Sequence, residues 1–199
     1  MVTITVSVGP LSLSNLTFTP DGELMNLDVN DPELTGADLT FKVKRAPGGD
    51  GLAHVGTVDA SGIDLANVTV KGDLSRIFAG DSSTAGNKTI DQLTVRSLGV
   101  EKIAPVFSDI VGPIGMVKIK GDINGARLFL HGAPSDDPTP EPDPNASIGQ
   151  LLIKGSIIGG STTESGSVQA EGSIALVKIG RDSSQQLPGV TKVYVEEVA

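Results

Sequence analysis

The chain has 199 residues and a formal net charge of −9 at pH 7, with a sequence pI near 4.6. Because binding to a phosphate backbone needs clustered lysine and arginine, this charge argues against nucleic acid as a partner. The absence of cysteine excludes a disulfide framework and any cysteine-based zinc site. No run of about 18 apolar residues occurs, so no membrane insertion is expected.

The hydrophobic residues are mostly aliphatic. They make up 38% of the chain, yet there are only five Phe, one Tyr and no Trp. Few large rings are present to fill a wide globular core, whereas stacked β-branched residues fill a narrow tube. The 25 Gly and 12 Pro indicate frequent turns and interrupt nearly every window long enough for a helix. Composition therefore favours an all-β solenoid.

The N-terminal segment reads as a strand. Residues Met1–Val8 alternate apolar and polar side chains and lack the basic and apolar regions of a signal peptide. We expect either a cytosolic protein or a piece of a longer secreted chain. Residues 1–37 as a whole are predicted to form an N-terminal cap or atypical coils.

A short acidic loop follows. Asp28, Asn30 and Asp31 offer hard oxygen ligands, and calcium takes about six to eight of them. Their spacing matches neither an EF-hand nor the Gly-Gly-x-Gly-x-Asp calcium repeat. The loop is therefore either a calcium site, the one cofactor that the sequence suggests, or an Asx-type turn ahead of a strand at Leu39.

The dominant feature is an internal repeat. An apolar-x-apolar pair, usually followed by Lys or Arg, recurs along the chain, and five of the six steps between copies are 24 to 27 residues long. Such a period predicts that each copy is one lap of a stacked structure. The copies are Leu16–Phe18, Phe41–Val43, Val68–Val70, Leu93–Val95, Val117–Ile119, Leu151–Ile153 and Val177–Ile179.

The remaining step, from Ile119 to Ile153, is 34 residues long and contains the proline-rich acidic stretch Pro134–Asn145. Proline cannot supply ladder hydrogen bonds, so this stretch should extend away from the stack. Because the same pattern resumes beyond it, we interpret residues 134–147 as a protruding loop of one coil and not as a domain boundary.

Several copies continue with Lys-Gly-Asp or Lys-Gly-Ser, as in Lys71-Gly-Asp73 and Lys120-Gly-Asp122. We expect the glycine to supply a backbone angle that a residue with a Cβ would resist, and the aspartates to offset the stacked lysines. A second strand should follow each such turn, and Val168–Ala170 suggests a third.

These patterns predict one domain, residues 1–199: a right-handed parallel β-helix of about seven coils of about 25 residues each. Met1–Val8 and Lys192–Val198 alternate like end-covering strands, and residues 187–199 would form a C-terminal strand or cap. The alternative fold is a pair of immunoglobulin-like sandwiches, which would also show short strands and turns. It gives no reason for one tripeptide to recur at constant spacing.

Several segments resemble repeats in very long predicted surface or secreted proteins of planctomycete-type bacteria. The resemblance covers roughly residues 38–182, fits residues 1–37 poorly and has motifs of only moderate specificity. It implies an extracellular or cell-surface β-helical segment, related in architecture to autotransporter passengers and pectate-lyase-like solenoids, and it carries over no catalytic residue. The segments are Leu39–Gly51, Val68–Leu74, Ile148–Ser161 and Ser165–Ile174.

No catalytic site is predicted. A polysaccharide lyase or hydrolase on a β-helix would need carboxylates and basic residues on one face, beside aromatic platforms. The acidic and basic residues near one line of the repeat sit where turns would place solvated charges anyway, and the aromatics are lacking. They are Asp73, Arg76, Asp122 and Arg127. His54 and His131 have no nearby Ser or Cys partner in a recognisable context and are expected in loops.

The sequence thus predicts a non-enzymatic structural or adhesive segment that spaces or displays other domains of a larger surface protein, or contacts a cell-surface or matrix component. The alternatives are a carbohydrate-active β-helix enzyme and a module that self-associates end to end through its open edges.

Overall fold

The computed structural model describes residues 1–81, 86–99, 106–133 and 141–180. These residues form strands and two short 3₁₀ turns, η1 (Leu13–Asn15) and η2 (Pro32–Leu34), so the fold is all-β as predicted. None of the helical segments found there has the length and apolar character needed to cross a membrane. Residues 134–140 of the predicted loop and all of residues 187–199, Lys192–Val198 included, lie outside the described ranges.

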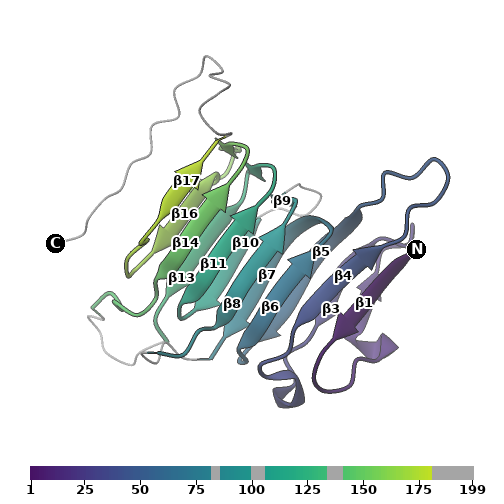
Figure 1. The fold of residues 1–199 in the computed structure, drawn as a ribbon, viewed down its shortest axis with the longest axis horizontal. Helices are drawn as coiled ribbons and strands as arrows, with labels where there is room; N and C mark the ends of the chain where they lie inside the picture. The colour runs from purple at the N-terminus through teal and green to yellow at the C-terminus, as the bar shows by residue number, and fades with distance from the viewer. Residues whose placement is uncertain (82–85, 100–105, 134–140, 181–199) are drawn as a thin grey trace.

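The first sheet contains seven strands, and Figure 1 shows them following one another along the long axis from the N-terminal to the C-terminal end. Its neighbouring strands are parallel except for the antiparallel pair β1–β4, which places the N-terminal strand at the end of the sheet. In spatial order the strands are β1 (Val2–Val6), β4 (Leu39–Val43), β6 (Leu65–Val70), β8 (Ile90–Val95), β11 (Ile114–Ile119), β14 (Ile148–Ile153) and β17 (Val177–Ile179).

The second sheet divides into two branches. Its early strands β5 (Ala53–Ser61) and β7 (Gly72–Gly80) are nine residues long and pair in parallel along most of their length. The first part of β7 pairs with β9 (Ser97–Leu98), and the last part pairs with β10 (Phe107–Val111). The first branch continues with β12 (Ile123–Asn124) and β15 (Ile157–Ile158), and the second with β13 (Arg127–His131) and β16 (Ser167–Ala170).

Each later repeat therefore runs through three strands, for example β8, β9 and β10, before it returns to the first sheet. The parallel pairing contradicts the alternative of immunoglobulin-like sandwiches, whose sheets are antiparallel. It is compatible with the predicted β-helix. Within the described residues, antiparallel pairing occurs only at the N-terminal end, where β2 (Leu16–Phe18) also pairs antiparallel with β3 (Leu24–Asp28).

Equivalent apolar residues of successive repeats lie opposite one another in the first sheet. Strand spacing places each side chain about 4.8 Å from the next, so that the residues form a continuous buried column. All members are buried except the last, Val177, which is half-buried. The column consists of Leu39, Val68, Leu93, Val117, Leu151 and Val177.

A second column runs beside the first through the residues that define the repeat. Val95 lies opposite Ile119, and Ile119 lies opposite Ile153. At the N-terminal end, however, Val70 lies opposite Phe41 and not opposite Val43, so the predicted register was wrong by two residues there. The connection between β4 and β5 is longer than the one between β6 and β7, so this repeat contains more residues than the later ones and its register shifts.

The predicted copy Leu16–Phe18 was also wrong. This segment forms β2, which pairs antiparallel with β3 at the end of the second sheet. Its apolar-x-apolar pattern is the ordinary alternation of an edge strand, which a tripeptide cannot distinguish from a coil.

The core is as aliphatic as composition predicts. Phe41 is the only aromatic side chain among the buried hydrophobic residues of the described ranges, and the others in that set are Leu, Ile, Val and Ala. β-branched and γ-branched side chains stack on like side chains without voids, so a narrow interior can be filled.

The glycines of the turns have a different role from the predicted one. Gly72 does not adopt positive φ. A Cβ at Gly72 would overlap the carbonyl oxygen of Ala53 on the neighbouring strand, and one at Gly155 would lie 2.6 Å from the carbonyl oxygen of Gly121. Close approach of successive backbones therefore requires glycine here.

We expect Leu151→Ala to lower the free energy of unfolding by about 2–5 kcal/mol, because it opens a cavity in the first column. Gln150 precedes it on the same strand but is exposed, so Gln150→Ala should change stability by less than about 0.5 kcal/mol. Urea unfolding of both variants measures the difference. Equal losses of stability in the two variants would contradict the burial of one face of β14.

The glycine contacts predict a graded effect. Gly72→Ala should cost about 1–3 kcal/mol, because the new methyl group forces two backbones apart. Gly121→Ala should cost less, since its Cβ would lie 3.0 Å from the nearest atom, the carbonyl oxygen of Arg96. Thermal unfolding of the two variants gives the comparison, and a larger loss for Gly121→Ala would contradict the assigned role.

Candidate functional site

A polar column runs along the corner between the two sheets. Register places His54 opposite Asp73 and Asp73 opposite Ser97, and the pairing of Leu98 with Ile123 brings Asp122 next in the series. The parallel ladder that stacks the apolar residues thus also stacks these polar ones. Sequence reasoning missed this group, because His54, Asp73 and Ser97 are far apart along the chain.

Asp73 is the centre of this group, with only 3% of the residue exposed. Its carboxylate accepts two hydrogen bonds from Arg96, from Nε at 2.8 Å and from a terminal nitrogen at 2.5 Å. It also accepts a hydrogen bond from the Ser97 hydroxyl. Buried carboxylates need such partners, so Asp73 is not the solvated turn residue that we predicted.

His54 lies between two carboxylates. Its Nδ1 is 3.3 Å from Asp73 and its Nε2 is 3.4 Å from Asp50. His54 belongs to β5, so its predicted position in a loop was wrong. Ser97 follows Asp73 by 24 residues, about one repeat, and this spacing is the signal that would have grouped those two; His54 precedes Asp73 by only 19 residues and could not be grouped in this way.

The electrostatics of the corner follow from these contacts. The hydrogen bond to Asp73 raises the pKa of Arg96, against a smaller opposing effect of burial. At the exposed end, the backbone N–H of Leu52 donates to Asp50 and lowers the pKa of that carboxyl group.

This geometry favours an anchor over a catalytic centre. A serine nucleophile needs a base that can take up its proton. The Ser97 hydroxyl donates to Asp73, but the ion pair with Arg96 stabilises that carboxylate in its charged form and so makes it a weak base. His54 contacts Asp73 on the other side. The group therefore fixes three successive strands at the corner.

The four residues considered for polysaccharide chemistry do not share one line. Asp73 and Asp122 lie in the corner column. Arg76 and Arg127 instead lie on the outer face of the second branch, with Phe107 of β10 opposite Arg127 of β13. The two pairs belong to different columns because the second sheet divides.

Aromatic residues gather on this outer face, contrary to the expectation that they are lacking. The Arg127 guanidinium lies 5.1 Å from the ring centre of Phe107 and 4.5 Å from that of Phe129, and Arg76 lies 5.5 Å from that of Phe78. Such pairs contribute about 0.5–2 kcal/mol each. Alternation along short strands explains why the phenylalanines point outward together.

Arg127 and His131 on the outer face each lie beside a carboxylate, although the buried Nε of Arg127 has no hydrogen-bond partner in the described part of the chain. Arg127 contacts Glu164 at 2.5 Å and donates to Gln169 at 2.8 Å. His131 lies 3.0 Å from Asp109 and stacks on Phe129, and it ends β13 instead of lying in a loop as predicted.

The predicted calcium ligands do not converge on one point. The Asp28 carboxylate accepts a hydrogen bond from the backbone of Asn30, and that of Asp31 accepts one from the backbone of Glu33, where it caps η2. These are the local turns of the alternative interpretation. Within the described ranges no group of three or more His, Cys, Asp or Glu is placed to hold a metal ion. Calcium binding at Asp28, Asn30 and Asp31 stays a prediction.

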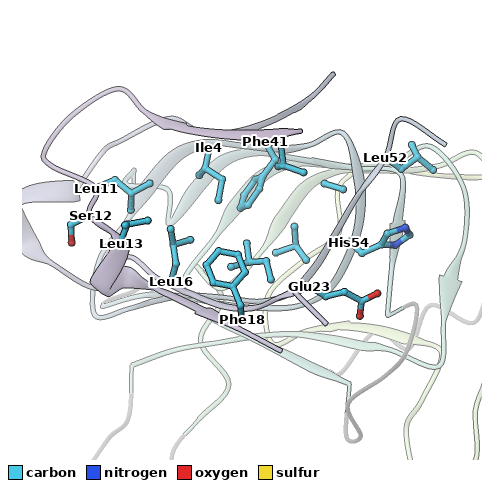
Figure 2. Close-up of a pocket in the computed structure, with 15 residues that line it drawn as sticks. Ile4, Leu11, Ser12, Leu13, Leu16, Phe18, Glu23, Phe41, Leu52 and His54 are labelled. Carbon is cyan, nitrogen blue, oxygen red and sulfur yellow. The ribbon is translucent and has the colours of Figure 1, made fainter. Parts of the chain in front are cut away.

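The N-terminal end contains a cavity of about 640 Å³. Figure 2 shows Ile4 and Phe41 on one side of it, Leu16 and Phe18 on the other, and His54 with Glu23 toward one end. The walls are mostly apolar, because this is where the stacked core meets the antiparallel end strands. His54 thus belongs to both the corner column and the cavity.

Comparisons of the chain with protein-family models, with curated proteins and with solved structures give no match.

We expect Asp73→Asn to lower the free energy of unfolding by about 1–3 kcal/mol, because the buried amide cannot accept all the hydrogen bonds from Arg96 and Ser97. The lower part of that range applies if Arg96, whose side chain is 45% exposed, regains water. The control is Asp91→Asn, which removes an exposed pair with Lys88 and should cost about 0–1 kcal/mol. Chemical denaturation at pH 7 measures both. A cost for Asp73→Asn no larger than for Asp91→Asn would contradict the anchor.

Proposed function

We propose that the chain is a right-handed parallel β-helix segment of about seven coils, which acts as a rigid, non-enzymatic spacer or display scaffold within a larger extracellular or cell-surface protein. The single observation that carries the proposal is the register of the first sheet. Six strands in succession place like aliphatic residues on one another from Leu39 to Val177. A continuous ladder of this kind resists bending, because every lap is hydrogen-bonded to the next.

The polar groups support the same proposal. Asp73 is saturated by Arg96 and Ser97, and Arg127 is held by Glu164 and Gln169. Groups that neutralise one another stabilise a scaffold but leave no poised acid, base or nucleophile.

Rigidity can be measured across the stack. The chain has no cysteine, so Thr3→Cys and Lys178→Cys place two dyes on the terminal strands of the first sheet. Six strand spacings put these positions about 29 Å apart. Single-molecule energy transfer should show one narrow population that persists in urea until global unfolding. A broad distribution, or one that shifts gradually in urea, would contradict a rigid spacer.

The non-enzymatic part is tested separately. The purified chain should release no product from acidic or neutral polysaccharides, with or without calcium. Turnover that disappears in Asp73→Ala or Asp122→Ala would overturn this part and favour a carbohydrate-active enzyme.

A further inference from the structure

The N-terminal cavity has the size and lining of a ligand site. Small-molecule sites typically enclose about 300–1,000 Å³, with apolar walls and a few polar groups that orient the ligand. This cavity, of about 640 Å³, combines apolar walls with polar groups at its ends. Its lining includes Ile4, Leu11, Leu16, Phe18, Leu24 and Phe41.

The walls are held apart by hydrogen-bonded structure. On one side β1 pairs with β4 along five residues, and on the other β2 pairs with β3. The η1 turn is fixed to β3, because the side-chain amide nitrogen of Asn15 donates to the Asp28 carbonyl at 3.0 Å. The side-chain Oδ1 of Asn15 accepts a hydrogen bond from the backbone N–H of Ser12, which closes the turn. The cavity is therefore a feature of the paired backbone and not a gap that side chains alone could close.

Apolar surface is concentrated at the same end. Six of the eight large hydrophobic residues that are most exposed within the described ranges lie in the first 25 positions. Three of them, Val2 (47% exposed), Leu13 (82% exposed) and Phe18 (52% exposed), also line the cavity. Exposed apolar side chains at the rim of an apolar cavity are the arrangement that an aliphatic ligand would cover.

The polar end of the cavity selects against an anion. Glu23 and His54 are the titratable residues of the lining, and the exposed carboxylate of Asp50 lies 3.4 Å from His54 Nε2. Two cations on neighbouring strand ends, the Met1 ammonium and Lys71, donate instead to the carbonyls of Lys44 and Val43. A carboxylate head group would thus lie near the carboxylates of Glu23 and Asp50, which would repel it, whereas an ammonium head group would be attracted to them.

We propose that this cavity binds a single-chain aliphatic amphiphile with a cationic head group, its alkyl chain between Ile4, Leu16 and Phe41 and its head at Glu23 and His54. The site is independent of the spacer role. The apolar columns of the first sheet extend from β4 toward β17, whereas the cavity is lined by residues of β1, on the other side of β4.

The test uses decylammonium and decanoate, below their micellar concentrations, in calorimetric titrations of the full chain at pH 7. Decylammonium should bind one to one, and about tenfold more tightly than decanoate because of the carboxylates at the polar end. Glu23→Gln should reduce this preference. Tighter binding of decanoate, or no saturable binding of either probe, would overturn the proposal.

Cavity-filling variants locate the site. Leu16→Trp, and independently Ile4→Trp, should each lower decylammonium affinity at least about tenfold, because the indole occupies the space of the alkyl chain. The two substitutions lie on different strands, so the test still works if one of the two variants does not fold. The control is Met25→Trp, on the same hairpin but outside the lining, and it should bind like the parent chain. Unchanged binding in both filling variants would overturn the assigned site.

The same samples are examined by analytical ultracentrifugation. The proposal requires a monomer that stays a monomer when decylammonium is added. Dimerisation that is abolished by Leu16→Trp would show instead that a second copy covers this end, and would overturn the proposal.

Discussion

The structure depends on one constraint: each lap of the backbone must present to the next an apolar side chain of nearly the same shape at the same position. Leu93, Val117 and Leu151 meet this constraint in the first sheet. Because parallel strands are hydrogen-bonded at a fixed spacing, a column that fits at one level fits at all of them. The narrow aliphatic core, the scarcity of buried rings and the glycines where successive backbones touch all follow from it.

The constraint also organises polar residues. His54, Asp73 and Ser97 form a group because they occupy the same corner in successive repeats. Phe78 and Phe129 lie on either side of Asp109 in one column of the outer face, and Phe107 lies opposite Arg127 in the column beside it. A repeat structure therefore creates local clusters from residues far apart in sequence. Such a cluster is a structural anchor when its polar groups form hydrogen bonds with one another, and a candidate binding site when it leaves groups or space available to a ligand. Asp73 is satisfied by Arg96, whereas the cavity beside Phe41 leaves apolar walls facing each other across open space.

The parallel pairing of the strands was predictable from residue 65 onward. Val95, Ile119 and Ile153 recur at the period of the repeat and lie opposite one another, and Val70 follows Val68 and Thr69, which lie opposite Leu93 and Thr94. The first laps were not predictable, because Leu16–Phe18 and Phe41–Val43 show an alternation that edge strands and coils share. The glycine role was misjudged since close approach of Gly72 to Ala53 is a property of neighbouring laps and not of the local sequence. The corner group and the cavity were missed because both need the register, and the cavity also needs the antiparallel pairing of β1.

The stacking can be tested directly by cross-linking. Lys118 of β11 lies opposite Leu152 of β14 in the first sheet, and the chain has no native cysteine. A disulfide forms when Cα atoms are about 4.4–6.8 Å apart, so Lys118→Cys with Leu152→Cys should oxidise readily. Lys118→Cys with Gln150→Cys, displaced by two residues along the same strand, should not. Efficient cross-linking of the displaced pair, together with failure of the aligned pair, would contradict the register from which every other feature of the structure follows.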